Sequence, residues 1–293
     1  MTAIRVRRSV LYMPGSNTRA LEKAKTLPAD ALILDLEDAV APEAKNDARE
    51  HVCAAVRDGG YGKREVAIRV NGLITEWGVA DLKVAARSGC DAVCVTKMQS
   101  GNDVAAIRAG LEIAEAPPEL AIWAMIETPD GVLNAREIAA AAAGDNYPLT
   151  VLIMGTNDLA KQSRALQTAD RLPMLAWLSH CVLAAHSCGI DILDGVYNNF
   201  KDDEGLVREC TQGRELGMDG KTLIHPGQID AANRIFAPDE TEVEWARKII
   251  AAFDEPENKG KGVITLEGKM VELLHRESAI RTVAIADAIE EMA

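Results

Sequence analysis

Eight short apolar runs alternate with stretches of helical periodicity between residues 9 and 224. Each run ends in polar residues, glycine or proline, and Val, Leu, Ile and Ala predominate within it. Continuous apolar runs of this length are typical of strands buried on both faces of a parallel sheet. The predicted strands are Ser9–Met13, Ala31–Leu36, Glu65–Val70, Ala92–Thr96, Leu120–Ile126, Thr150–Met154, Ile192–Val196 and Gly220–Ile224.

Eight strand–helix units in succession predict a (β/α)8 barrel, which is an α/β fold. The alternative is a doubly wound open sheet, which normally carries a glycine-rich phosphate-binding turn after its first strand. Neither G-x-G-x-x-G nor G-x-x-x-x-G-K-[ST] occurs in the sequence. We therefore predict a TIM barrel over residues 1–236.

The pattern changes in residues 237–293, which we expect to form a small helical extension. The predicted elements are an acidic helix over Glu240–Phe253, a strand or hairpin over Val263–Lys269 and a closing helix over Met270–Ala293. Gly260 and Gly262 lie in the polar loop before the strand, as in a hinge. We expect this extension to act as a lid, over its own barrel mouth or that of a neighbouring subunit.

The composition limits the classes of function. The chain has 293 residues, 48% hydrophobic and 26% charged, as in an ordinary globular protein with a large core. Its net charge of −13 argues against a general nucleic-acid binder, which needs a basic face. Local Arg and Lys side chains can still receive a small anionic substrate.

The sequence also suggests a compartment. The first apolar run is stopped by Pro14 and Gly15, too early for a signal peptide or a membrane span. The six cysteines lack the CxxC spacing of zinc sites, and several lie in apolar runs. We expect buried thiols, no membrane partner and a cytoplasmic location.

Two carboxylates follow successive predicted strands. Glu127 ends the run Leu120–Ile126, and Asp158 follows the run Thr150–Met154. The carboxyl ends of parallel strands are where α/β folds place their chemistry, and neighbouring strands lie about 5 Å apart. We therefore expect the two side chains to share one small cation. The alternative is that Glu127 caps a helix and Asp158 occupies a turn.

A second polar group follows the predicted strands Ala31–Leu36 and Glu65–Val70. Asp35 and Glu37 are two residues apart and point to one face of a strand, and Asp38 follows them. Arg69 lies inside an apolar strand, where a charge is unfavourable unless it meets carboxylates. We expect Arg69 to pair with Asp35 and Glu37 and to bind a substrate carboxylate or thioester oxygen beside them.

Three further basic residues have two interpretations each. Lys97 follows a predicted strand, as Schiff-base lysines do, but an acid-rich mouth raises a lysine's pKa and favours an ion pair instead. Arg19, in a predicted helix over Thr18–Thr26, is either a phosphate contact or a surface charge. His225 precedes a proline, and we expect it to be structural rather than a base.

Taken together, these residues resemble a known family. The motifs, in chain order, are RSVLYMPGSN, LILDLEDAV, IRVNG, MIETPDG, MGTNDL, KTLIHPGQI and GKGVITLEGKMV. The chain resembles the citrate lyase β-subunit-like family of the HpcH/HpaI aldolase superfamily, which includes malyl-CoA, methylmalyl-CoA and citramalyl-CoA lyases. The resemblance implies a (β/α)8 barrel with a C-terminal extension, assembled as a homotrimer or hexamer.

The resemblance also implies roles for individual residues. It implies that Glu127 and Asp158 bind Mg2+ and that Arg69 binds the substrate and stabilises an enolate. The acidic pair Glu37 and Asp38 matches residues that hold metal-bound water. The backbone amides of Gly155, Thr156 and Asn157 are then expected to hold the carboxylate of a 2-oxo acid.

Glu272 departs from the pattern of malyl-CoA lyase-like members. There the matching residue is an aspartate from the adjacent subunit, which acts as acid and base at the acetyl methyl group. Glutamate is longer by one methylene, about 1.5 Å, which is enough to affect a proton transfer.

The expected function is Mg2+-dependent carbon–carbon cleavage or formation. The substrate would be a 3-hydroxyacyl-CoA such as malyl-CoA or citramalyl-CoA, with acetyl-CoA and glyoxylate or pyruvate as the products. The partners are thus an acyl-CoA and a small 2-oxo acid. The alternatives are a malyl-CoA thioesterase, a citrate lyase β subunit active only with partner subunits, and a CoA-independent aldolase, which the lid disfavours.

Overall fold

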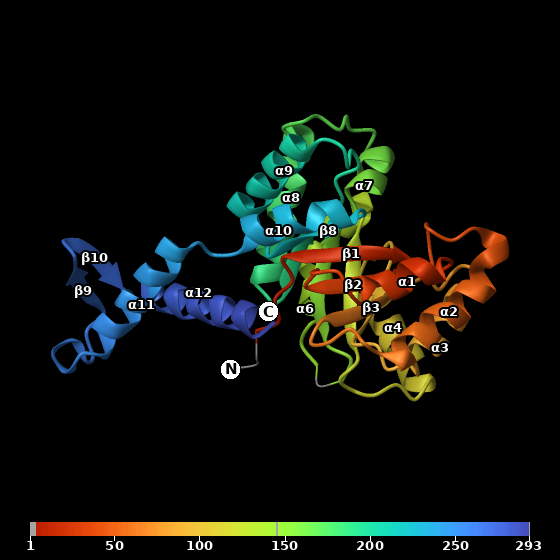
Figure 1. The fold of residues 1–293 in the computed structure, drawn as a ribbon, viewed down its shortest axis with the longest axis horizontal. Helices are drawn as coiled ribbons and strands as arrows, with labels where there is room; N and C mark the ends of the chain where they lie inside the picture. Colours follow the sequence, from red (N-terminus) through yellow and green to blue (C-terminus); the bar gives the residue numbers. More distant parts are fainter. Residues whose placement is uncertain (1–3, 145, 293) are drawn as a thin grey trace. The chain divides into compact units, whose positions relative to one another are not determined.

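Eight parallel strands form a closed barrel in chain order, with β1 paired to both β2 and β8 (Figure 1). The computed structural model describes residues 4–144 and 146–292. The barrel strands are β1 Ser9–Pro14, β2 Ala31–Asp35, β3 Glu65–Val70, β4 Ala92–Val95, β5 Ala121–Ile126, β6 Leu149–Met154, β7 Asp191–Asp194 and β8 Gly220–Leu223. All eight predicted strands are confirmed, with ends that differ by at most two residues.

Helices on the outside of the barrel follow the strands. They are α1 Thr18–Ala24, α2 Lys45–Asp58, α3 Gly78–Ala85, α4 Gly101–Ile113, α5 Pro129–Leu133, α6 Ala135–Ala140, α7 Thr156–Ser163, α8 Leu175–His186, α9 Asp203–Leu216 and α10 Ile229–Phe236. Strands and helices from Arg7 to Phe236 form one compact unit. The TIM barrel prediction is therefore confirmed.

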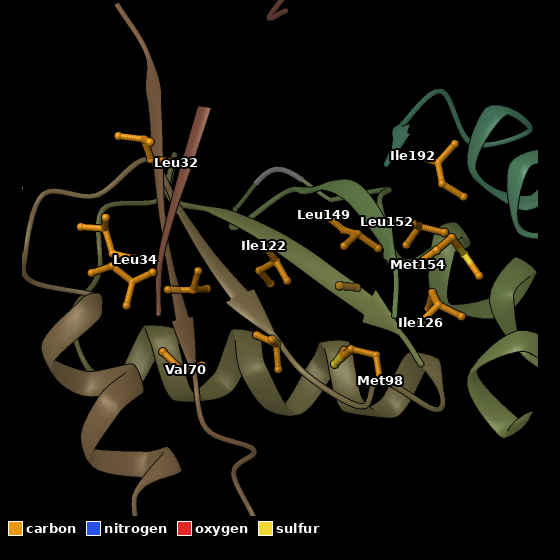
Figure 2. Close-up of a cluster of buried hydrophobic side chains, with 14 of the residues drawn as sticks. Leu32, Leu34, Val70, Met98, Ile122, Ile126, Leu149, Leu152, Met154 and Ile192 are labelled. Atoms are coloured by element: carbon orange, nitrogen blue, oxygen red, sulfur yellow. The ribbon is translucent and has the colours of Figure 1, made fainter. Parts of the chain in front are cut away.

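The strands are apolar on both faces because each face meets a different core. One core fills the inside of the barrel with small residues such as Ala31, Ala67 and Ala92, together with the fully buried Trp123. The other lies between the strands and the helices. Figure 2 shows part of this core, and the side chains that it labels come from β2, β3, β5, β6, β7 and the loop after β4. Two cores on opposite faces explain the continuous apolar runs in the sequence.

The register brings the predicted polar residues to one end of the barrel. Asp35 is paired with Arg69 across β2 and β3, and both are the last or next-to-last residues of their strands. Ile126 is paired with Met154, so that Glu127 and Gly155 follow at the same level. The carboxyl ends of several strands therefore meet at one mouth.

A second compact unit contains, of the described residues, 4–6 and 237–292. Its elements are α11 Glu240–Asp254, β9 Val263–Leu266, β10 Lys269–Glu272 and α12 Leu273–Met292, and β9 and β10 form an antiparallel hairpin. A small core joins them, with Phe253, Ile264 and Val271 among its members. The predicted start of the last helix at Met270 is wrong, because residues 269–272 pair with β9, and Ala293 lies outside the described residues.

Within the described residues, no helix has both the length and the apolar character needed to cross a membrane. The longest, α12, carries charged residues along its length, including Arg276, Arg281 and Asp287.

Candidate active site

Arg69 is buried at the barrel mouth and is held by Asp35. Its Nε donates to Oδ1 of Asp35 at 2.7 Å and its Nη2 to Oδ2 at 2.5 Å. Asp35 also accepts the backbone N–H groups of Glu37 and Ala39. Burial alone would lower the pKa of Arg69, but Asp35 outweighs it and raises that pKa well above the ordinary value. The guanidinium is therefore a fixed positive charge.

Glu37 and Asp38 complete the group around Arg69. Nη1 of Arg69 lies 2.9 Å from Oε2 of Glu37 and 3.6 Å from Oδ2 of Asp38. The predicted pairing of Arg69 with Asp35 and Glu37 is thus confirmed, whereas the Asp38 side chain is 70% exposed. Burial raises the pKa of Glu37, and Asp38 adds to this while Arg69 opposes it. Glu37 is therefore a stronger base than an exposed glutamate.

Glu127 is buried directly after β5. Its Oε1 accepts the backbone N–H of Lys97 at 2.8 Å. Burial, with repulsion from Glu37 and Asp158, raises the pKa of Glu127 from 4.5 to about 7. Gly155 lies against this carboxylate, and a Cβ at that position would stand 2.3 Å from the Cβ of Glu127. Only glycine leaves room for Glu127 there.

Lys97 stands among three carboxylates. Its Nζ lies 3.3 Å from Oε1 of Glu37 and 3.6 Å from Oδ2 of Asp158. Burial would lower the pKa of Lys97, but Glu37, Glu127 and Asp158 raise it overall, so its predicted ion pairing is confirmed. Its φ of +54° is unusual for a residue with a side chain. This backbone conformation directs its N–H to Glu127 and its ammonium to the other two carboxylates.

Asp158 lies in the first turn of α7, not on an extended segment after β6. Its side chain is 31% exposed, whereas Glu127 is a buried residue. The described residues contain no group of three or more His, Cys, Asp or Glu side chains arranged for a metal ion. Glu127 and Asp158 are nevertheless hard oxygen donors whose mutual repulsion a cation would relieve. One or two carboxylates with water and substrate is how Mg2+ is usually held, so the residues fit that ion.

The amides expected to hold a carboxylate differ in availability. The N–H of Gly155 donates to the carbonyl of Ile126 at 3.0 Å and is therefore engaged within the barrel. Thr156 and Asn157 are the first residues of α7, where backbone N–H groups have no intrahelical acceptor. The Asn157 side chain bonds to Asn198 and Gln167 at the rim.

Three other candidates, Arg19, His225 and Glu272, have surroundings of their own. Arg19 is exposed on α1, and within the described residues no ion pair to it is found. His225 accepts the N–H of Gly227 and stacks on Phe200 with ring centroids 5.0 Å apart, which gives it a structural contact. Glu272 ends β10 in the second unit, half-buried, with its N–H donated to Nδ1 of His275.

The model of the HpcH/HpaI aldolase/citrate lyase family matches residues 8–226, which include every strand of the barrel. The chain belongs to the HpcH/HpaI aldolase/citrate lyase family.

Individual members of the family are similar over almost the whole chain. A protein of Cereibacter sphaeroides (strain KD131 / KCTC 12085) named (3S)-malyl-CoA thioesterase is 50% identical over 283 residues, 96% of this chain and 95% of that protein. Citrate lyase subunit beta of Escherichia coli (strain K12) is 36% identical, over 92% of this chain and 89% of that protein. The crystal structure of protein CitE from Mycobacterium tuberculosis in complex with magnesium, acetoacetate and coenzyme A is 29% identical. It superposes with a TM-score of 0.73 over 94% of this chain and 97% of that chain.

Two residues near Arg69 and Glu37 are not predicted from the sequence. The ring of Tyr12 lies 4.8 Å from the guanidinium carbon of Arg69. Tyr12 is two residues after the interior-facing Val10, so the period of a strand could have placed it inside the barrel. The second residue, Lys45, is 5% exposed and bonds to the backbone of Glu37. A lysine at the start of a polar helix is normally expected on the surface, and no pattern in the sequence predicts its burial.

Proposed function

We propose that this chain is a Mg2+-dependent enzyme that hydrolyses the thioester of a malyl-CoA-like substrate. The observation that carries the proposal is its 50% identity, over 96% of the chain, to a protein named (3S)-malyl-CoA thioesterase. The site supports it, since a fixed guanidinium and a buried carboxylate of raised pKa lie side by side at the barrel mouth. Hydrolysis needs both an oxyanion partner and a base.

Glu127 and Asp158 would hold the magnesium ion. When bound, the ion would orient and polarise the hydroxyl and carboxylate oxygens of the malyl group. The amides of Thr156 and Asn157 would donate to the far carboxylate oxygen, since the start of a helix favours negative charge. Arg19 on α1 is proposed as a contact to a phosphate of CoA.

Arg69 and Glu37 would carry the reaction at the thioester. Arg69 would donate to the carbonyl oxygen, where negative charge develops. Glu37, with Asp38 beside it, would take a proton from a water whose oxygen bonds to the carbonyl carbon. The carbon–sulfur bond then breaks, and the CoA sulfur leaves with the proton that Glu37 received.

Carbon–carbon cleavage of the same substrate is the second candidate, and the family description and the similarity to citrate lyase β subunits favour it. Here the hydroxyl would lose its proton to Glu37, the bond between the hydroxyl-bearing carbon and the methylene would break, and glyoxylate would leave. Arg69 would stabilise the enolate of acetyl-CoA. Glu272 would then supply the proton to its carbon.

We propose that Glu272 serves the site of another copy in a homotrimer or hexamer, with residues 237–293 as the lid. Four large apolar side chains near Glu272 in the second unit are 48% to 67% exposed, as in a surface that binds a partner. They are Val263, Met270, Leu273 and Leu274. The six free cysteines favour a reducing compartment, and we infer the cytoplasm.

The products of the purified chain decide between these functions. It would be incubated with (3S)-malyl-CoA and citramalyl-CoA, with Mg2+ or with EDTA, and the products separated by mass spectrometry. Malate and CoA in the presence of Mg2+ would support hydrolysis, whereas acetyl-CoA and glyoxylate would support the lyase. Turnover only after addition of citrate lyase partner subunits would make the chain a subunit of that complex, and no turnover in any mixture would reject all three.

A further inference from the structure

Lys45, the first residue of α2, is turned inward instead of toward solvent. It is only 5% exposed. Its Nζ donates to the backbone carbonyls of Leu36 and Glu37 at 2.8 and 2.7 Å, and to Oδ1 of Asn71 at 3.0 Å. An ammonium group has three donors, and all three are used here.

The acceptors of Lys45 are themselves held in place. Nδ2 of Asn71 donates to the carbonyl of Leu36 at 2.8 Å and to Oδ2 of Asp81 at 2.6 Å. Nε of Arg49 donates to the other oxygen of Asp81 at 2.8 Å. A network whose members are all bonded fixes a single geometry.

The indole of Trp77 covers the ammonium, with its centre 5.2 Å from Nζ of Lys45. Burial lowers the pKa of Lys45, and nearby carboxylates oppose that change, Asp35 and Glu37 foremost. The three hydrogen bonds of Lys45 and the carboxylates of Asp35 and Glu37 therefore stabilise the charged lysine at this buried position.

The network joins the two strand ends that carry the reacting groups. Leu36 and Glu37 follow β2, and Glu37 is the residue whose carboxylate lies 2.9 Å from Arg69. Asn71 follows β3, two residues after Arg69. Lys45 therefore bonds to the segment after β2 and to the segment after β3, and so links the two.

We propose that Lys45 is a positioning residue: it fixes the backbone at Glu37 so that this carboxylate meets Arg69 in the geometry that the thioester reaction needs. The inference rests on the proposed function for its kinetic test. The bonds of Lys45 go to two backbone carbonyls and to Asn71, so it would act on the reaction through the position of Glu37. A misplacement near 1 Å in such a pair can reduce the rate about 10²-fold.

Arg64 offers a matched control. It is another part-buried cation that donates to backbone carbonyls, those of Tyr61, Ala24, Leu27 and Lys25, at 2.5 to 2.8 Å. It directly precedes β3, whereas Arg69 lies near that strand's other end. Arg64→Met therefore removes a comparable set of bonds at the end of the strand remote from the site.

The experiment compares Lys45→Met with Arg64→Met and the wild type in the full chain. We expect both variants to lose thermal stability, and only Lys45→Met to lose kcat, by at least ~10²-fold, with KM within about 3-fold of the wild type. A crystal structure of Lys45→Met should show the Glu37 carboxylate displaced from Arg69. Equal kcat in the two variants, or an unmoved Glu37, would overturn the proposal.

Two further arms keep the test decisive. If Lys45→Met is not recovered folded, Asn71→Ser takes its place, because it removes one acceptor of the ammonium and leaves the lysine charged; the same fall in kcat at constant KM is expected. If the wild type turns over no thioester, the proposed function has failed, and the displacement of Glu37 in the crystal structure alone decides the role of Lys45.

Discussion

Arg69 holds both carboxylate oxygens of Asp35 through two parallel hydrogen bonds, of 2.7 and 2.5 Å. A bidentate bond of this kind fixes the plane of the guanidinium as well as its position. The third nitrogen, Nη1, is then directed to Glu37. The protein therefore sets the orientation of Arg69 before any substrate binds, as electrostatic stabilisation of a developing charge requires.

Replacement of Arg69 by lysine tests this fixed orientation. Arg69→Lys keeps the charge but loses the planar fork, so we expect kcat with malyl-CoA to fall by at least ~10²-fold. Arg87→Lys, which alters an exposed ion pair with Glu115, is the control and should leave kcat unchanged. Steady-state kinetics measure both, and a wild-type kcat in Arg69→Lys would reduce Arg69 to a structural partner of Asp35.

The proposed magnesium site makes a prediction that does not depend on turnover. Asp158→Asn removes one of two anionic ligands, so we expect Mg2+ binding measured by calorimetry to weaken greatly while the fold is kept. Asp130→Asn, on the nearby α5 but exposed, should bind Mg2+ as the wild type does. Unchanged Mg2+ affinity in Asp158→Asn would exclude Asp158 as a ligand.

The raised pKa of Glu127 predicts a pH-dependent loss of stability in EDTA. The pKa is about 7 in the folded protein against an ordinary 4.5, so the folded state holds the proton more tightly than the unfolded chain. This group therefore lowers the free energy of unfolding as the pH rises from about 4.5 to about 7, by on the order of 3 kcal/mol.

Glu127→Gln cannot lose that proton. We expect it to match the wild type near pH 4 and to be the more stable protein near pH 8, as measured by urea unfolding in EDTA. The difference between the two proteins cancels the contributions of the other carboxyl groups. A difference that stays constant across this range would contradict the raised pKa.

The shared-lid proposal for Glu272 predicts complementation between inactive variants. Glu272→Ala and Glu127→Gln should each lack lyase activity, and a mixture dissociated and reassembled should recover part of it, because mixed assemblies contain intact composite sites. Glu267→Ala, in the turn of the same hairpin, is the control. Full lyase activity in Glu272→Ala, or in a protein that sediments as a monomer, would exclude the shared site.

The cysteines predict one reactive thiol in the folded protein. Cys188 is half-buried, whereas the other five are buried. Burial raises the pKa of Cys90 and Cys181 to about 12, so these thiols stay protonated near pH 8 and react slowly. Titration with a chromogenic disulfide should give one fast equivalent, absent in Cys188→Ser, and six equivalents in denaturant. More than one fast equivalent would mean that the helical layer opens readily.

The barrel and the ion pair between Asp35 and Arg69 were predictable because both follow from patterns in the sequence. Continuous apolar runs identified the strands, and the closed order of a barrel placed the strand of Asp35 beside that of Arg69. The position of Asp158 was harder to predict from the sequence. Strand β6 ends at Met154, and the polar residues that follow it start a helix, which apolar periodicity alone does not resolve.

The hairpin before α12 shows a different limit. Its turn places Glu267 and Gly268 at φ values of +48° and +78°, and such turns are most strongly signalled by Asn-Gly or Asp-Gly. With Glu-Gly the signal is weak, so the sequence predicts residues 270–272 as the start of the helix instead of as part of the second strand. Lys45 was missed for a third reason, since its acceptors are backbone carbonyls that no sequence pattern marks.

Trp123, fully buried among the small side chains inside the barrel, gives the molecule an internal optical reporter. An indole in an apolar interior emits at shorter wavelength than one in water, so opening of the barrel should shift its fluorescence to the red. Trp245 lies in the second unit, beside Lys269. Single-tryptophan variants of the chain would therefore report separately on the thermal unfolding of each unit. They would also show whether one unit unfolds at a lower temperature than the other.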